Sequence, residues 1–132
     1  MSDPKLPEDR RYTKSHEWVR IEGSDVTVGI TDHAQSELTD IVFVDLPAVG
    51  KAVTAGQSAL VLESVKTVAD VYAPVSGAIV AVNDELKAHP ELINQDPYGR
   101  GWIFRVRASG SVDAGAFLDG PSYRATWSAA GH

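Results

Sequence analysis

Lys66 is the residue of this chain whose type and position point most directly to chemistry, because it lies between two runs of strand-forming residues. Residues 58–62 are mostly apolar, and residues 67–72 are rich in β-branched and aromatic side chains and stop before Pro74. Two such runs with a short connection predict a β-hairpin, with Lys66 exposed at its tip. The ε-amine of an exposed lysine can be acylated, which removes its charge and adds a long, flexible tether.

The connection between the two runs gives no further local signal. It lacks the Asn-Gly or Asp-Gly pair that favours tight hairpin turns. A lysine in a turn is most often a solvated charge without any other role. From the hairpin alone, Lys66 is therefore either an attachment site or an ordinary surface lysine.

A second group of polar side chains precedes Trp18 and consists of Ser15, His16 and Glu17. The simplest interpretation is the start of a strand, with Trp18 in the core and with His16 and Glu17 in solvent. His33 could suggest a metal site or a general base. However, no second histidine or carboxylate pair lies at ligand spacing around it in the sequence, so we interpret it as a structural residue or a partner contact.

The sequence predicts no catalytic residue and no metal site. It contains no Gly-x-Ser-x-Gly elbow, no phosphate-binding loop and no dinucleotide fingerprint, and its four histidines are scattered. It has no cysteine, which excludes disulfides, thiolate metal sites and cysteine nucleophiles. Any sulfur redox chemistry must therefore come from an attached group.

Length and composition favour one globular domain. The chain has 132 residues, is 43% hydrophobic and carries a net charge of −6, which disfavours a nucleic-acid partner. No apolar run approaches the roughly 18 residues that span a bilayer, so no membrane association is expected. Residues 1–11 have mixed charge and no apolar segment, unlike a secretory signal, and we expect a cytoplasmic protein, although a mature mitochondrial matrix form would look the same.

The elements that must position these residues are mostly strands. The expected strands cover residues 12–21, 26–30, 41–46, 58–62, 67–72 and 102–107. Short helices are expected at 34–38, with Thr31 or Asp32 as the cap, once within 85–94, and at 112–118 and 122–127. Residues 49–56 and 75–83 share a pattern of glycine at a bend followed by alternating apolar residues, which predicts two small sheets packed face to face.

Several of these motifs together resemble the H protein of the glycine cleavage system, a lipoyl carrier. The resemblance extends from Tyr12 to about Tyr123. It rests on the stretches at 15–18, 29–35, 40–47, 63–67, 70–77 and 94–102. It implies a mostly β, lipoyl/biotinyl-type flattened barrel-sandwich with short helices and a C-terminal helical segment. Residues 1–11 would then be an N-terminal extension, and 12–132 one carrier domain with a helical appendage from about 111. Thr39 replaces a glycine common in the family, so the turn before Asp40 is expected to be tight or strained.

The resemblance also implies a role for the residues around the hairpin tip. Lys66 would carry (R)-lipoate in amide linkage, and Glu63, Ser64, Val65 and Thr67 would form the stretch that the lipoylating enzyme recognises. Biotin sites typically have methionine on both sides of the lysine, and the lipoyl domains of 2-oxo acid dehydrogenases usually have aspartate before it. The residues that precede Lys66 here, Ser64 and Val65, are similar to those of the H protein instead.

In the H-protein family, the arm loaded with an aminomethyl group folds back into a surface cleft. Ser15, Glu17 and Asp70 lie at the matching positions. A carboxylate and a hydroxyl would hold the cationic amine through charge-assisted hydrogen bonds and keep it from water.

The function implied by the resemblance is that of a shuttle, not of an enzyme. Its partners would be glycine decarboxylase (P protein), the tetrahydrofolate-dependent aminomethyltransferase (T protein), dihydrolipoyl dehydrogenase (L protein) and a lipoyl ligase or lipoyl transferase. Two alternatives stay open. The chain could relay lipoate to 2-oxo acid dehydrogenase subunits, or it could be a β-rich interaction module whose lysine is never modified.

Overall fold

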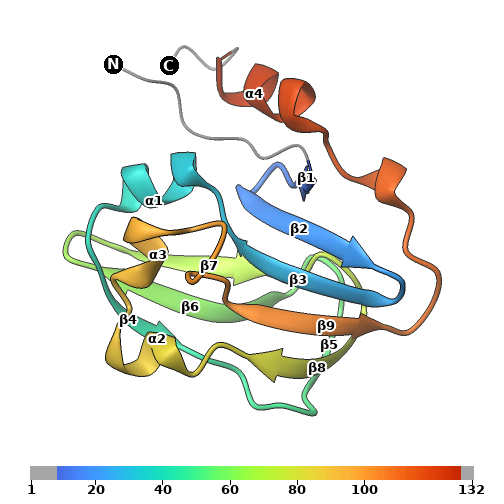
Figure 1. Ribbon diagram of the computed structural model, residues 1–132, viewed down its shortest axis with the longest axis horizontal. Helices are drawn as coiled ribbons and strands as arrows, with labels where there is room; N and C mark the ends of the chain where they lie inside the picture. The colour runs from blue at the N-terminus through green and yellow to red at the C-terminus, as the bar shows by residue number, and fades with distance from the viewer. Residues whose placement is uncertain (1–8, 129–132) are drawn as a thin grey trace.

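A computed structural model describes residues 9–128 and arranges them as two antiparallel sheets (Figure 1). The strands are β1 (Arg11–Tyr12), β2 (Glu17–Glu22), β3 (Asp25–Ile30), β4 (Ile41–Asp45), β5 (Ala52–Val53), β6 (Ser58–Ser64), β7 (Val68–Tyr72), β8 (Gly77–Val82) and β9 (Phe104–Ala108). The larger sheet has the order β1-β2-β3-β9-β8-β5, and the smaller has the order β4-β6-β7. The expected mostly β architecture with short helices is confirmed.

Both sheets contribute to one apolar core. Strand residues that alternate along the chain point to the same face of a sheet, and the β-branched residues of β3 and β9 follow this rule. Val28 on β3 and Val106 on β9 are fully buried, and they pack in one cluster with Leu62 and Val71 of the smaller sheet. The two sheets therefore hold each other in place, and the hairpin of β6 and β7 projects from a rigid base.

The expected strand over residues 12–21 is interrupted, because a tight turn separates β1 from β2. The backbone N–H of Thr13 donates to the Glu17 carbonyl at 2.9 Å, and the N–H of His16 donates to the Thr13 carbonyl at 3.1 Å. His16 closes this turn with a φ of 72°, a backbone conformation that non-glycine residues rarely adopt. No glycine or proline marks this turn in the sequence.

β4 is less buried than its apolar sequence suggested. Ile41 and Val44 are buried, as expected, whereas Val42 and Phe43 are 53% and 51% exposed. The pairing of β4 with β6 shifts register between Ile41 and Phe43, so a bulge interrupts the alternation. A bulge adds an unpaired residue to one strand, which explains why two consecutive apolar side chains reach the surface.

A helix, α1 (Asp32–Leu38), follows β3 and matches the expected position. Thr31 is its N-cap, and the Thr31 hydroxyl accepts a hydrogen bond from the N–H of Ala34 at 3.1 Å. Thr39 ends the helix with φ 65° and ψ −150°, a region that is used almost only by glycine. The strain expected at Thr39 is therefore present in the backbone.

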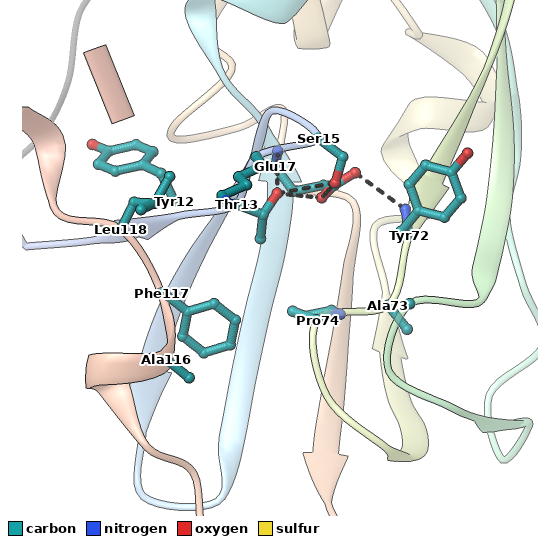
Figure 2. A pocket seen from close by; sticks show the side chains of 12 residues that line it. Tyr12, Thr13, Ser15, Glu17, Tyr72, Ala73, Pro74, Ala116, Phe117 and Leu118 are labelled. Atoms are coloured by element: carbon teal, nitrogen blue, oxygen red, sulfur yellow. Dashed lines mark hydrogen bonds between the residues drawn. The ribbon is translucent and has the colours of Figure 1, made fainter. Parts of the chain in front are cut away.

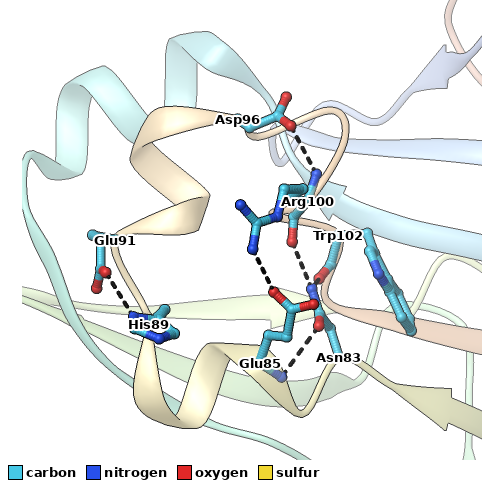
Figure 3. Close-up of polar contacts among 7 residues, drawn as sticks. All are labelled: Asn83, Glu85, His89, Glu91, Asp96, Arg100 and Trp102. Atoms are coloured by element: carbon cyan, nitrogen blue, oxygen red, sulfur yellow. Dashed lines mark hydrogen bonds and ion pairs between the residues drawn. The ribbon is translucent and has the colours of Figure 1, made fainter.

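Two short helices, α2 (Glu85–Ala88) and α3 (Leu92–Gln95), occupy the segment where one helix was expected. Figure 3 shows how Asn83 ties this segment to the strand that follows: its amide donates to the carbonyls of Arg100 and Trp102 at 2.7 and 2.8 Å. The Arg100 guanidinium pairs with Glu85 at 2.9 Å. Asn83 is only 5% exposed, so these bonds satisfy a buried amide.

The C-terminal segment forms a single helical turn, η1 (Ala114–Ala116), and then α4 (Gly120–Ser128). The helix expected over 112–118 is therefore only this turn, and Pro121 lies inside α4, near its start, where a missing backbone N–H costs little. Tyr123 of α4 stacks on Tyr12 with ring centroids 5.1 Å apart.

Most of the predicted N-terminal extension, residues 1–8, lies outside the described residues, and the division at residue 12 stays a prediction. None of the helices within residues 9–128 is long and apolar enough to cross a membrane.

Candidate functional site

The hairpin of β6 and β7 presents Lys66 to solvent in the turn that joins the two strands. The side chain of Ser64 holds this turn, because its hydroxyl accepts hydrogen bonds from the backbone N–H groups of Thr67, at 3.1 Å, and Lys66, at 3.3 Å. The N–H of Val65 also donates to the Asp40 carbonyl at 3.0 Å, which fastens the turn to the residue before β4. The turn is thus ordered by a serine in place of the Asn-Gly pair that the sequence lacks.

The outer face of the smaller sheet surrounds the lysine with apolar and acidic side chains. Phe43, Glu63 and Val68 are paired across β4, β6 and β7, and all three are exposed. Val65, beside Lys66, is 65% exposed. Residues 63–67, predicted as the recognition stretch, thus lie at one accessible end of the sheet.

A pocket of about 330 Å³ opens beside β7 and brings together the three residues predicted to hold the arm. Its walls come from the loop before β2, from the start of β2 and the end of β3, from α1 and from the smaller sheet. They are formed by Ser15, His16, Glu17, Ile30, His33, Ala34, Glu37, Leu38, Leu62, Ala69, Asp70 and Val71. We call this space the docking pocket. Ser15 and Glu17 lie far from Asp70 in the sequence, and the structure places all three around one cavity.

Glu17 is almost fully buried, at 2% exposed, so the expectation that it is solvated is wrong. Its Oε1 accepts hydrogen bonds from the hydroxyls of Thr13 and Ser15, at 2.5 and 2.6 Å, and its Oε2 accepts one from the backbone N–H of Tyr72 at 3.2 Å. Figure 2 shows these bonds. A buried carboxyl group needs such donors, and these three hydrogen bonds fix its position in the wall of the docking pocket.

Asp70 lies on β7, which is an edge strand of the smaller sheet. Its side chain is exposed and accepts a hydrogen bond from the Ser58 hydroxyl at 2.7 Å. A carboxylate has two oxygens and about four acceptor positions, so Asp70 can bind a further donor. The docking pocket therefore has one buried carboxylate, that of Glu17, and two exposed ones, those of Asp70 and Glu37.

His16 and His33 lie together in the docking pocket, with ring centroids 5.0 Å apart. His16 was expected in solvent, but the residue is half-buried and its Nδ1 lies 2.7 Å from the Tyr123 hydroxyl. His33 is buried, and its Nε2 lies 3.8 Å from Glu37 on the next turn of α1. Within residues 9–128, no group of three or more His, Cys, Asp or Glu side chains is arranged to hold a metal ion.

A second pocket, of about 490 Å³, lies against the same loop and shares Ser15 and Glu17 with the docking pocket. Figure 2 shows Phe117 and Leu118 of the C-terminal segment on one side of it and Ala73 and Pro74 on the other. The Glu17 carboxylate thus lies in the wall between two surface cavities.

A small two-sheet β domain that presents a lysine at the tip of a hairpin, next to a pocket lined by carboxylates, has the features of a carrier domain with a covalently attached arm. Comparison with known proteins gives the family. The pattern described as "Glycine cleavage H-protein" matches residues 10–129. The chain belongs to the glycine cleavage H-protein family.

Individual relatives agree with this assignment. The chain is 54% identical over 121 residues to the glycine cleavage system H protein of Cronobacter sakazakii, which covers 91% of this chain and 94% of the relative. It is 54% identical over 119 residues to that of Thermus thermophilus, covering 90% and 93%. A crystal structure of a glycine cleavage system H protein from Mycobacterium marinum superimposes with a TM-score of 0.84 at 42% identity, over 94% of this chain and 99% of that one. The chain is therefore a non-catalytic carrier protein of the glycine cleavage system, in agreement with the function expected from its sequence.

Proposed function

We propose that Lys66 carries the lipoyl group of this carrier, in amide linkage. Three observations support this assignment. Lys66 is exposed at an ordered hairpin tip, the residues that flank it are accessible, and the turn is closed by Ser64, so an enzyme can reach the amine while the strands stay paired. Within residues 9–128 no salt bridge involves Lys66, so acylation of its amine breaks no ion pair. When attached, lipoate supplies a pair of sulfurs that can be reduced and can hold an aminomethyl group.

The strongest support for the proposal is the position of the docking pocket beside β7, within reach of an arm attached to Lys66. Asp70 follows Lys66 by four positions, which corresponds to about 13 Å along an extended chain. A lysine side chain extended by a lipoyl chain has a comparable reach. The arm can therefore lie along the free edge of β7 and place its end between Asp70 and the Ser15–Glu17 loop.

In this proposal, Asp70 and Glu17 hold the positively charged amine of the cargo, and Ser15 contributes its hydroxyl. The buried Glu17 carboxylate supplies a fixed negative charge, because three hydrogen bonds hold it in place. The exposed Asp70 carboxylate lies on the edge strand, toward solvent. Apolar residues such as Leu62 and Leu38 line the remaining wall and limit the access of water.

The partners we propose follow from this carrier role. They are glycine decarboxylase (P protein), which loads the aminomethyl group, the aminomethyltransferase (T protein), which passes its carbon to tetrahydrofolate, and dihydrolipoyl dehydrogenase (L protein), which reoxidises the sulfurs. A lipoyl ligase or transferase would attach the arm, with Glu63, Ser64, Val65 and Thr67 as its contact stretch. The protein would thus act in glycine catabolism and one-carbon metabolism, and the bacterial sources of its relatives support a cytoplasmic location.

Intact mass spectrometry tests the attachment site. The protein is expressed with lipoate and a lipoyl ligase, next to Lys66→Arg and to Lys87→Arg, which changes another exposed lysine. We expect a gain of one lipoyl group in the wild type and in Lys87→Arg, and no gain in Lys66→Arg. Lipoylation of Lys66→Arg would overturn the assignment, and an unmodified wild type, under conditions that modify a known lipoyl domain, would favour the unmodified interaction module.

A further inference from the structure

The Tyr123 hydroxyl joins three segments that are remote in the sequence. It lies 2.7 Å from Nδ1 of His16 in the loop before β2, and 2.8 Å from the hydroxyl of Thr31, which caps α1. Tyr123 itself belongs to α4 and is fully buried. One phenol therefore connects the C-terminal helix to both ends of the segment that runs from the loop through β2 and β3 to α1.

Both partners of this hydroxyl lead directly to the walls of the docking pocket. His16 lines the pocket between Ser15 and Glu17. Thr31 does not line it, but the Thr31 hydroxyl caps the N–H of Ala34, and Ala34 does. Tyr123 is absent from the lining, so it influences the pocket through its neighbours, His16 and Thr31 among them.

The loop wall of the pocket needs such support because His16 has a φ of 72°. A left-handed backbone at a residue with a side chain costs roughly 1–2 kcal/mol, and it persists only where the surroundings hold it. The stacking of Tyr123 on Tyr12 fixes the phenol ring, and Tyr12 is itself paired with Leu118 through two backbone hydrogen bonds of 2.8 Å. The stacking on Tyr12 thus fixes the Tyr123 ring in the orientation in which its hydroxyl reaches His16.

One set of hydrogen-bond directions is consistent with all these contacts. The Thr31 hydroxyl accepts from Ala34 and can donate its own proton to the Tyr123 oxygen. The Tyr123 hydroxyl can then donate to Nδ1 of His16 when that nitrogen carries no proton. Burial, above all other causes, raises the pKa of Tyr123 above its ordinary value, so this donor keeps its proton at neutral pH.

We propose that Tyr123 is a positioning residue for the docking pocket, which it serves by holding His16 and the start of α1 in the arrangement that places Ser15 and Glu17 opposite Asp70. This inference rests on the proposed docking of the loaded arm. It makes the C-terminal helix a part of the functional site, although the sequence suggested only an appendage.

The test uses Tyr123→Phe, which removes the hydroxyl and keeps the ring that stacks on Tyr12. Tyr98→Phe is the matched control, because the Tyr98 hydroxyl also reaches α1, where it accepts from the N–H of Asp32 at 3.0 Å. The first measurement is the ¹⁵N spectrum of the histidine rings in the full-length, unlipoylated protein. We expect the Nδ1 signal of His16 to change in Tyr123→Phe and to keep its wild-type position in Tyr98→Phe.

The second measurement is the rate at which the lipoylated protein loses its aminomethyl group without enzymes. We expect Tyr123→Phe to raise this rate about fivefold, the effect of one hydrogen bond. His16→Asn, in which asparagine tolerates the left-handed backbone, should also raise it. The double variant should raise it no further than Tyr123→Phe alone, because the contact with Tyr123 that His16→Asn removes is one of the two that Tyr123→Phe removes. Additive effects, or an unchanged His16 signal, would overturn the proposal.

Asp70→Asn separates this inference from the docking proposal on which it rests. If Asp70→Asn accelerates the loss and Tyr123→Phe does not, docking stands and the positioning role of Tyr123 is wrong. If neither change alters the rate, the arm does not use this pocket and both proposals fail. Equal lipoylation of all variants confirms that the hairpin remains intact in each comparison.

Discussion

The carboxylate of Glu17 accepts a hydrogen bond from the backbone N–H of Tyr72, with 3.2 Å between Oε2 and the nitrogen. Glu17 opens β2 in the larger sheet, and Tyr72 ends β7 in the smaller one, so this contact joins the two sheets at the free edge of β7. The next residue, Ala73, donates in the opposite direction, to the Gln57 carbonyl at 2.8 Å. The N–H of Tyr72 would otherwise be an unpaired donor on an edge strand. Glu17 therefore links the two sheets and also lines the docking pocket, where we propose that it holds the cargo.

This double role predicts different outcomes for the two carboxylates. Glu17→Gln should lower the free energy of unfolding by about 1–2 kcal/mol, because a buried acceptor of three hydrogen bonds loses its charge. Asp70→Asn should change it by less than about 0.5 kcal/mol, because the side chain is exposed. Both should accelerate the non-enzymatic loss of the aminomethyl group, by about tenfold. Chemical denaturation and the decay of loaded protein measure the two effects, and an unaltered decay rate in both variants would contradict the docking role.

The strained backbone of Thr39 predicts a stabilising substitution. Thr39→Gly should raise the free energy of unfolding by about 1 kcal/mol, because glycine adopts φ 65° and ψ −150° without steric cost. The gain is smaller than the full strain, since the Thr39 hydroxyl also bonds to the Leu38 carbonyl and glycine gains entropy in the unfolded chain. Thr54→Gly, at an exposed threonine without a positive φ, should instead lower the stability. Equal effects of the two changes in urea titrations would show that strain at Thr39 is negligible.

Close packing of β8 against β9 predicts that Gly77 cannot be replaced. A Cβ atom at Gly77 would lie 2.0 Å from the carbonyl oxygen of Arg107, which belongs to the backbone and cannot rotate away. Gly77→Ala should therefore destabilise the protein by about 2–3 kcal/mol or shift the strand register. At Gly110 a Cβ atom would meet no atom within 4 Å, so Gly110→Ala is the control and should leave the thermal midpoint nearly unchanged. A Gly77→Ala protein as stable as the control would refute the close approach.

Burial of three tyrosines predicts a loss of stability at high pH. Burial is the largest cause in each case and raises the pKa of Tyr98 to about 12, and those of Tyr12 and Tyr123 further. The folded protein thus holds these protons more tightly than the unfolded chain, whose tyrosines have a pKa of about 10. The stability they contribute is complete below about pH 10 and falls as the pH rises toward 12. Denaturation curves across this range, with tyrosinate absorbance as the second signal, should show ionisation and unfolding together. Ionisation of all four tyrosines in a protein that stays folded would contradict the prediction.

Local patterns in the sequence were sufficient for the hairpin and for α1. The apolar run before Lys66, the β-branched run after it and the capping hydroxyl of Thr31 all act between near neighbours, and the structure confirms each of these elements. The exposure of Phe43 was not predictable in this way, because it depends on a bulge in the pairing of β4 with β6. An apolar side chain in a strand is expected in the core from its type alone. Which face of the sheet it points to depends on the register of strand pairing.

For the candidate site, too, some residues were predictable from the sequence and others were not. Ser15, Glu17 and Asp70 were selected because their positions match those of a known family, and the structure brings them to one cavity. The contacts of His16 with His33 and Tyr123 were not predicted. His33 is 17 residues and Tyr123 is 107 residues from His16 in the sequence, and neither spacing carries a periodic signal. Contacts of this kind exist only once β2 and β3 have paired and α4 has packed on Tyr12. They cannot be read from any local window of the chain.

The bond between His16 and Tyr123 also sets an order of assembly. A hairpin closes through contacts between close neighbours in the chain, whereas Tyr123 follows the end of β7 by 51 residues and must return to a loop made long before it. On a ribosome, the lysine at the hairpin tip is consequently displayed before the residue that completes the neighbouring pocket has been synthesised. The proposed place of attachment and the proposed shelter for its cargo are thus separate in time during biosynthesis, and we expect a chain that ends before α4 to keep the first and lack the second.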